Sequence, residues 1–207
     1  LLTITLSDNS NPSIINISKR FYIYNSGIVD SNTTIPDLNN AYLLSDIAKM
    51  TRDQLMDEFK KSRYLMTDDI QDKFEKFDDL ETQKQFYFTF WKGFDPTPNT
   101  PNNEFKKDYF ERVAYANKHY KSDTRSGWES DRGRVYVLYG KPSETESYPF
   151  ESNSKGYEIW KYELLEGGVE FVFVDLINDG RTYELVHSTK RNEIRDDNWR
   201  RRISVQH

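Results

Sequence analysis

The stretch Gly127-Trp-Glu-Ser-Asp-Arg-Gly-Arg-Val-Tyr-Val-Leu-Tyr-Gly140 carries the strongest structural signal in this chain. It begins with a tryptophan, two acids and an arginine held between two glycines. It continues with β-branched and aromatic residues up to a third glycine, a composition typical of a strand. Apolar residues at helical spacing precede it, so the stretch is predicted to join a helix to a strand.

The polar residues of this junction allow two interpretations. In the first, Asp131 is a general base or ligand, and a neighbouring arginine binds an anion. In the second, Gly127 and Gly133 supply backbone freedom and Trp128 anchors the junction in the core. Asp131 would then accept hydrogen bonds from loop amides or pair with an arginine. No nucleophile or second polar cluster lies beside the junction in sequence, which favours the structural interpretation.

Helical signals lie before the junction and strand signals after it. Thr51 and Gln54 match a capping box, and Thr100 before Pro101 predicts the start of a long helix. Glycine-containing turns separate the extended segments, as in hairpins. Four antiparallel strands are expected, at Arg134–Tyr139, Tyr157–Glu163, Val169–Leu176 and Thr182–Ser188. The predicted fold class is α+β, an N-terminal helical layer followed by a four-stranded antiparallel meander.

An additional β segment is expected at the N-terminus. Residues 1–24 read as two strands, which are not stable in water by themselves. They are expected to be the trailing part of a preceding β domain or to pair with the sheet further on. Residues 1–38 are therefore assigned to this segment and a linker, and residues 39–207 to one α+β domain.

The composition excludes several classes of function. The chain has 207 residues and a net charge of −5, which disfavours nucleic-acid binding. It has no cysteine, so disulfides and thiolate chemistry are excluded. Its 14 Tyr, 13 Phe and 4 Trp can build a packed core despite the modest aliphatic content.

Candidate chemistry is sparse. Asp95, Glu104 and Asp131 are the carboxylates that could meet across a cleft as an acid–base pair of the glycosidase kind. More ordinary roles are a first-turn acid for Glu104 and a turn cap for Asp95. His119 and Asp123 could share a helical face, but two ligands do not make a metal site. The sequence therefore predicts no catalytic residue, no cofactor and no metal.

Three segments in order resemble the GWxTD domain family. The first contains Phe90-Trp91, Asp95-Pro-Thr-Pro98 and Asn103-Glu104, and the second runs from Tyr109 to Asn117. The third is the Gly127–Gly133 junction, followed by Gly140-Lys-Pro142. The resemblance covers about residues 40–188. It marks as fold-identifying, and not as catalytic, the motif residues Trp91, Asp95, Asn103, Glu104, Arg112, Gly127, Trp128, Asp131, Arg132 and Gly133.

The chain departs from the family pattern at two places. Ser130 stands where the family name has threonine. The hydroxyl is retained, so the same local hydrogen bond is expected with a looser χ1 preference. Lys92-Gly93-Phe94 is less basic than the pattern, which weakens a case for anion binding there.

The resemblance implies an exported cell-envelope protein of Bacteroidota-like bacteria. Such proteins are often lipid-anchored, with a β-sandwich region before this domain. The expected location is the periplasm or cell surface, associated with the outer membrane through an anchor outside this chain. The resemblance implies no established catalytic residue.

Three hypotheses for function follow. The leading one is a non-enzymatic interaction module, an accessory lipoprotein subunit of an outer-membrane assembly for secretion, transport or protein insertion. Exposed aromatic side chains would form its contact patch with other envelope proteins. The alternatives are a glycan-binding envelope protein and a hydrolase that uses Asp131, Glu104 and Asp95. All three depend on the role of Trp128, which is predicted to be a buried anchor between the helical half and the sheet.

Overall fold

The computed structural model describes residues 38–98 and 102–204. The expected β segment at residues 1–24 lies outside the described residues, as does most of the linker. In the described part, helices come first and a four-stranded sheet follows, which confirms the α+β class. The helical half contains α1 (Leu38–Leu44), η1 (Ile47–Lys49), α2 (Arg52–Lys61), η2 (Arg63–Leu65), α3 (Asp68–Glu75), α4 (Leu80–Lys92) and α5 (Glu104–His119).

The helix starts follow local capping signals. Thr51 and Gln54 form the predicted capping box at α2, because each side chain accepts the other's backbone N–H. The predicted start of the long helix was wrong. Helix α5 begins at Glu104, and its N-cap is Asn103, whose side-chain oxygen accepts the Lys106 backbone N–H at 2.9 Å.

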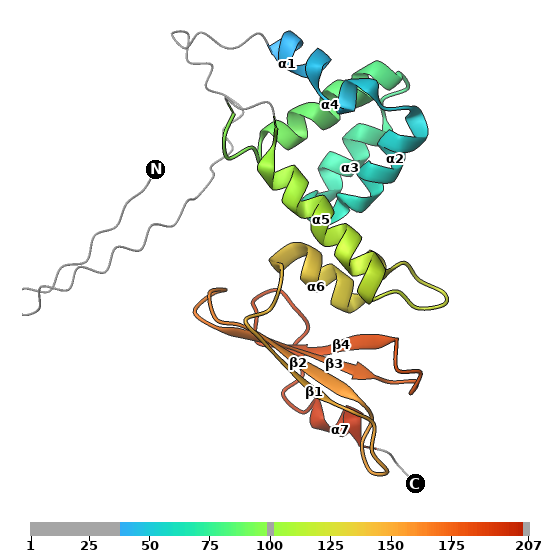
Figure 1. Cartoon of the computed structure of the whole chain (residues 1–207), viewed down its shortest axis with the longest axis vertical. Coiled ribbons are helices and arrows are strands. Elements are labelled where there is room, and N and C mark those ends of the chain that lie inside the picture. The colour runs from blue at the N-terminus through green and yellow to red at the C-terminus, as the bar shows by residue number, and fades with distance from the viewer. Residues whose placement is uncertain (1–37, 99–101, 205–207) are drawn as a thin grey trace, which may run out of the picture.

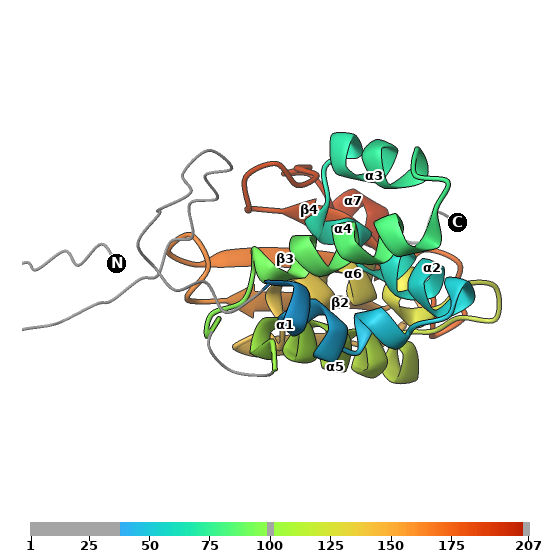
Figure 2. The same ribbon diagram turned by 90° about the horizontal axis from the view of Figure 1, so that it is seen from above.

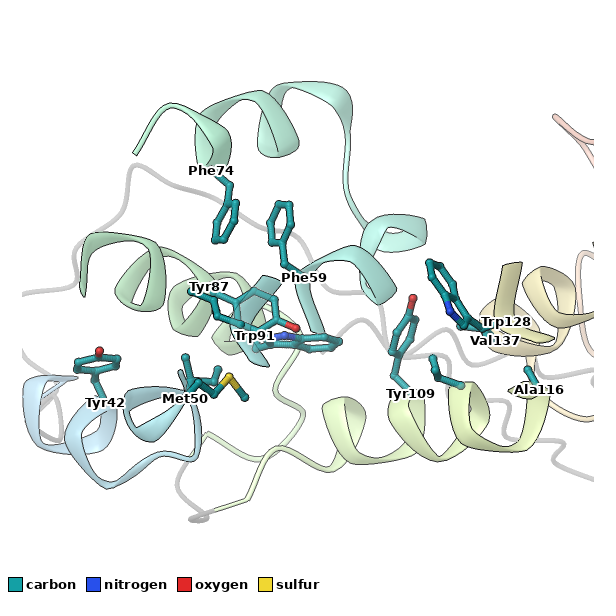
Figure 3. Packing of buried hydrophobic residues seen from close by; sticks show 13 residues of the cluster. Tyr42, Met50, Phe59, Phe74, Tyr87, Trp91, Tyr109, Ala116, Trp128 and Val137 are labelled. Carbon is teal, nitrogen blue, oxygen red and sulfur yellow. The ribbon is translucent and has the colours of Figure 1, made fainter. Parts of the chain in front are cut away.

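Aromatic side chains fill the core of the helical half (Figure 3). Trp91 lies at its centre and contacts Tyr87 and Tyr109 edge-on, with ring centroids 6.0 and 5.6 Å apart. All four tryptophans of the chain are buried, with exposed fractions between 2% and 6%. Tryptophan therefore contributes nothing to the predicted patch of exposed aromatic side chains, because these rings stabilise the interior instead.

The segment predicted as the first strand, Arg134–Tyr139, is instead part of a helix. Helix α6 (Asp131–Tyr139) follows the short η3 (Gly127–Glu129) and ends at Gly140, whose φ is +78°. Val135 packs in the core of the sheet, whereas Val137 packs in the core of the helical half. Residues two apart on a helix lie about 200° apart around its axis, so they point to opposite sides. A helix buried on both sides therefore shows the alternation of a strand.

The sheet is an antiparallel meander with the order β1-β2-β3-β4. Its strands are β1 (Glu144–Tyr148), β2 (Tyr157–Tyr162), β3 (Val169–Asp175) and β4 (Tyr183–Ser188). The last three match the predicted positions. The remaining strand, β1, was missed because it is an exposed edge strand without apolar alternation.

Helices cover the two faces of the sheet. Helix α6 lies between α5 and one face, and α7 (Arg200–Ile203) lies on the other (Figures 1 and 2). Phe171 and Phe173 of β3 pack on the α6 side, while Val172 and Val174 pack with Trp199 on the α7 side. Near the C-terminus, α7 and Trp199 thus dock on this face of the sheet.

Candidate functional site

The glycines of the motif bring three backbone segments into direct contact. A Cβ atom at Gly127 would lie 1.9 Å from the Ala116 carbonyl oxygen of α5. A Cβ atom at Gly133 would lie 1.8 Å from the Gly127 carbonyl oxygen. Only glycine permits such distances, so α6 crosses η3, and η3 crosses α5, at backbone contact.

Ser130 begins helix α6. Its hydroxyl oxygen accepts the Gly133 backbone N–H at 3.0 Å and donates to the Gly127 carbonyl at 2.7 Å. One hydroxyl therefore caps α6 and ties it to η3. The local hydrogen bond expected at this position is present.

Replacing Ser130 by alanine is expected to lower the free energy of unfolding by about 1 kcal/mol, because the cap of α6 is lost. Ser130→Thr keeps the hydroxyl that the family name specifies and should lie within about 0.5 kcal/mol of the wild type. Urea unfolding followed by tryptophan fluorescence measures both. A threonine variant as unstable as the alanine variant would contradict the assigned capping role.

Asp131 and Arg132 connect α6 to the sheet. The Asp131 carboxylate accepts the Leu185 backbone N–H of β4 at 2.7 Å. The Arg132 guanidinium donates to the Glu158 carboxylate of β2 at 3.0 Å and to the Arg181 carbonyl at 2.8 Å. The predicted hydrogen bond from a backbone amide to Asp131 is thus confirmed, with a strand amide as its donor.

Two aromatic rings contact the Arg132 guanidinium. Its central carbon lies 4.0 Å from the centroid of Tyr183 and 5.2 Å from that of Tyr120. Trp160 donates its indole N–H to Glu158 at 2.9 Å, which occupies the second carboxylate oxygen. Buried charge is therefore fully partnered here, as a low-dielectric interior requires.

A second arginine ties α6 to the segment after β4. Arg134 donates through two nitrogens to both oxygens of Glu193, at 2.8 and 2.7 Å. Tyr139 donates to the same carboxylate at 3.3 Å. The hydrogen bonds to Glu193 raise the pKa of Arg134. Bidentate pairing of this kind fixes orientation as well as charge.

Trp128 is buried as predicted, but it does not touch the sheet core. Its ring packs edge-on against Tyr64, and the Arg63 guanidinium lies 4.7 Å from its centroid. Tyr64 also donates its hydroxyl to the Trp128 carbonyl at 2.9 Å. Trp128 therefore fixes η3 to the helical half, whereas Asp131, Arg132 and Val135 reach the sheet.

Asp95, Glu104 and Asp131 do not form one cluster of contacts. Asp95 accepts the Thr97 backbone N–H at 3.0 Å and pairs with Lys92 at 3.2 Å. Glu104 accepts the Thr97 hydroxyl and stands in the first turn of α5. Asp95 and Glu104 thus meet at Thr97 in the turn and first-turn roles that the sequence suggested. Asp131 is instead bonded to β4.

The remaining motif residues link helices. Asn103 donates its side-chain amide to the Trp91 carbonyl at 2.7 Å, which joins the end of α4 to the start of α5. Arg112 of α5 donates to the Leu138 carbonyl of α6 at 3.4 Å. A Cβ atom at Gly140 would lie 3.2 Å from the central carbon of the Arg112 guanidinium. These contacts join α4 to α5 and α5 to α6.

His119 and Asp123 have separate contacts. The His119 ring stacks on Tyr115 at 4.1 Å between centroids, and Asp123 pairs with Arg181 at 2.8 Å. Within residues 38–98 and 102–204, no group of three or more His, Asp or Glu residues is arranged to hold a metal ion.

A polar network that the sequence did not predict lies inside the helical half. Lys106 of α5 is buried, and its ammonium contacts the carboxylates of Asp46 at 2.7 Å and Glu58 at 3.1 Å. The Tyr87 hydroxyl lies 3.5 Å from Glu58 and 2.8 Å from the Ser62 hydroxyl. Burial raises the pKa of Glu58, although Lys106 opposes the shift. The sequence signal for this network was the position of Lys106, three residues before Tyr109 on the buried face of α5.

An open groove of about 610 Å³ lies beside this network. Its lining combines one exposed and one buried apolar side chain, Leu44 and Met50, with polar and charged groups. The lining residues are Leu44, Asp46, Lys49, Met50, Gln54, Asp57 and Glu58. A second groove of about 440 Å³ is lined by side chains of α2, α3 and η2. Neither lining includes a motif residue, so the motif and these surface grooves are separate features.

The fold and junction define a class of protein, an α+β domain in which one short helix fixes a helical half to an antiparallel meander. The chain belongs to the GWxTD domain family, whose model matches residues 44–204. This confirms the resemblance seen in the three sequence segments. The comparisons with curated proteins and with solved structures give no match. No helix among the described residues has the length and apolar character needed to cross a bilayer.

Proposed function

We propose that this chain is a non-enzymatic protein-interaction module, an accessory lipoprotein subunit of an outer-membrane assembly for secretion, transport or protein insertion. Its envelope location, in the periplasm or at the cell surface, is part of the proposal and rests on family membership. The motif residues support the interaction role, because their polar groups are bonded to other parts of the same domain. Binding therefore has to use a surface away from the motif.

The observation that carries the proposal is the apolar rim of the larger groove. Leu43 and Leu44 end helix α1 with exposed fractions of 62% and 81%. Leu44 and Met50 line the groove itself. Adjacent exposed apolar side chains beside a concavity are typical of protein-binding surfaces.

The charges of the groove support a partner of one chemical kind. Asp46 and Asp57 have largely exposed carboxylates, and the partly exposed carboxylate of Glu58 lies next to them. An amphipathic helix of another envelope protein fits this chemistry. Its apolar face would cover Leu44 and Met50, and flanking Lys or Arg side chains would face the carboxylates.

Leu44→Glu is expected to reduce partner binding about 10-fold or more, because it puts a carboxylate into an apolar contact that already faces acids. The tagged protein would be captured from solubilised envelopes of the organism that makes it. Each co-purifying protein would then be titrated against purified wild type and variant. The matched control is Leu164→Glu on the β2–β3 hairpin, where the leucine is 94% exposed.

Both variants should unfold at the wild-type urea concentration, since both side chains are exposed. Equal binding by the Leu44 and Leu164 variants would contradict the groove as the docking surface. Recovery of the wild type only as a free monomer would contradict the interaction role itself.

A further inference from the structure

The two edges of the sheet differ in how their backbone groups are satisfied. At the β4 edge, the Leu185 N–H donates to the Asp131 carboxylate and the Ser188 N–H donates to the Ile194 carbonyl, each at 2.7 Å. Helix α6 and the segment after β4 thus close this edge. Strand β1 forms the opposite edge, and among residues 38–98 and 102–204 its strand partner is β2 alone.

The side chains of β1 present acids and an aromatic ring on one face. Glu144, Glu146 and Tyr148 alternate along the strand and therefore share a face of the sheet. This is the α7 face, because Tyr148 is opposite Tyr157 in register and stacks on it at 4.4 Å, and Tyr157 in turn contacts Trp199. Phe150 follows the strand and is exposed.

The two acids of β1 pair with one cation. Both Glu144 and Glu146 pair with the single ammonium of Lys161 on β2. Two carboxylates thus share one cation at an edge beyond which no strand of the described residues lies. An added strand would place its own side chains directly opposite them, about 4.5–5.5 Å away between Cβ atoms.

We propose that β1 is a docking edge for an extended segment of a partner protein, which adds as a further strand. That segment carries Lys or Arg opposite Glu144 and Glu146, and an apolar residue opposite Tyr148. Backbone hydrogen bonds supply the affinity and the charged pairs supply selectivity. The inference rests on the proposed role as an interaction module, but it concerns a surface distinct from the groove.

A second copy of this chain is a poor occupant of the same edge. Antiparallel pairing centred on Glu146 would put two Glu146 carboxylates opposite each other. Pairing centred on Thr145 would put Glu144 opposite Glu146 of the other copy. Like charges directly opposite destabilise a strand pair, so these two registers disfavour a second copy and favour a basic segment.

The test uses the fluorescein-labelled peptide Thr-Val-Thr-Lys-Thr-Lys-Thr, which in antiparallel pairing puts its valine opposite Tyr148 and its lysines opposite Glu146 and Glu144. A matched peptide has glutamate in place of both lysines. Binding is followed by fluorescence anisotropy, and hydrogen exchange reports protection of Glu144–Tyr148. The basic peptide should slow exchange in β1 and bind at least about 10-fold more tightly than the acidic one, since two opposed pairs change sign.

Glu144→Lys with Glu146→Lys should weaken the basic peptide about 10-fold. The matched control, Glu163→Lys with Glu184→Lys, changes the net charge equally but at the β2–β3 hairpin and the β4 edge, where both acids are exposed. It should leave binding within about 2-fold of the wild type. If the lysine variant of β1 does not fold, glutamine at both positions should still reduce binding.

Failure of the basic peptide to protect β1, or equal weakening by the control pair, would overturn the proposal. The Leu44→Glu variant should bind the peptide as the wild type does. The β1 edge can therefore fail this test while the groove is still supported as a docking surface. Equally, the groove can fail its own test while the β1 edge is supported.

Discussion

A Gly133→Ala variant is expected to lose about 4 kcal/mol or more in free energy of unfolding, a large fraction of the stability of a typical domain. The added Cβ would lie 1.8 Å from the Gly127 carbonyl oxygen and 3.0 Å from the Trp128 Cα. Both are backbone atoms, and Gly127 is itself pressed against the Ala116 carbonyl of α5. No side chain can rotate to relieve the overlap, so η3 and α6 would have to separate.

The control for this prediction is Gly167→Ala in the β2–β3 hairpin. Gly167 has a φ of +85°, and a Cβ there meets no atom within 4 Å. The control therefore carries only backbone strain, about 1–2 kcal/mol. Urea unfolding followed by the buried tryptophans measures both variants. If the two glycine variants were equally stable, close backbone packing would not be the role of Gly133.

Arg132→Met is expected to cost about 3–5 kcal/mol, because it leaves the Glu158 carboxylate buried without its cation. The two side chains are only 10% and 16% exposed, so water cannot replace the lost partner. The loss also removes the hydrogen bond to the Arg181 carbonyl and the contact with the Tyr183 ring. Arg132→Lys should be intermediate, since an ammonium cannot reproduce the fork of the guanidinium.

Two controls separate the buried pair from simple loss of charge. In Arg132→Met with Glu158→Gln, the uncompensated charge is gone, so the double variant should be more stable than Arg132→Met alone. Lys60→Met removes an exposed ion pair with Glu129 and should cost less than about 1 kcal/mol. A cost for Arg132→Met as small as that for Lys60→Met would show that the pair does not hold α6 to the sheet.

The residues after which the family is named have identifiable structural tasks in this chain. Gly127 permits contact with α5, Trp128 fixes η3 against η2, Ser130 caps α6 and Asp131 binds β4. The variable position of the name is Glu129, whose carboxylate pairs with Lys60 of α2. The motif therefore builds the joint between the two halves, while the groove and the β1 edge lie outside it.

Local signals in the sequence determined much of the fold. The capping box of α2, the turn role of Asp95 and the first-turn place of Glu104 each depend on residues a few positions apart, so composition and spacing suffice to predict them. The strands β2, β3 and β4 were also predictable, because β-branched and aromatic residues lie between glycine turns.

Tertiary structure alone decided the rest. Val135 and Val137 have the alternation of strand residues, yet they lie on helix α6. Val135 packs in the core of the sheet and Val137 packs in the core of the helical half. The edge strand β1 has no apolar pattern, and its pairing with β2 defines it. Lys106 meets Asp46 and Glu58 from positions far apart in the chain, and the groove beside them exists only once α1, η1 and α2 have packed. Contacts between distant residues leave no local spacing to read. The sequence therefore identified the residues of the joint, whereas only the folded form revealed that its central element is a helix and which surfaces are proposed to bind.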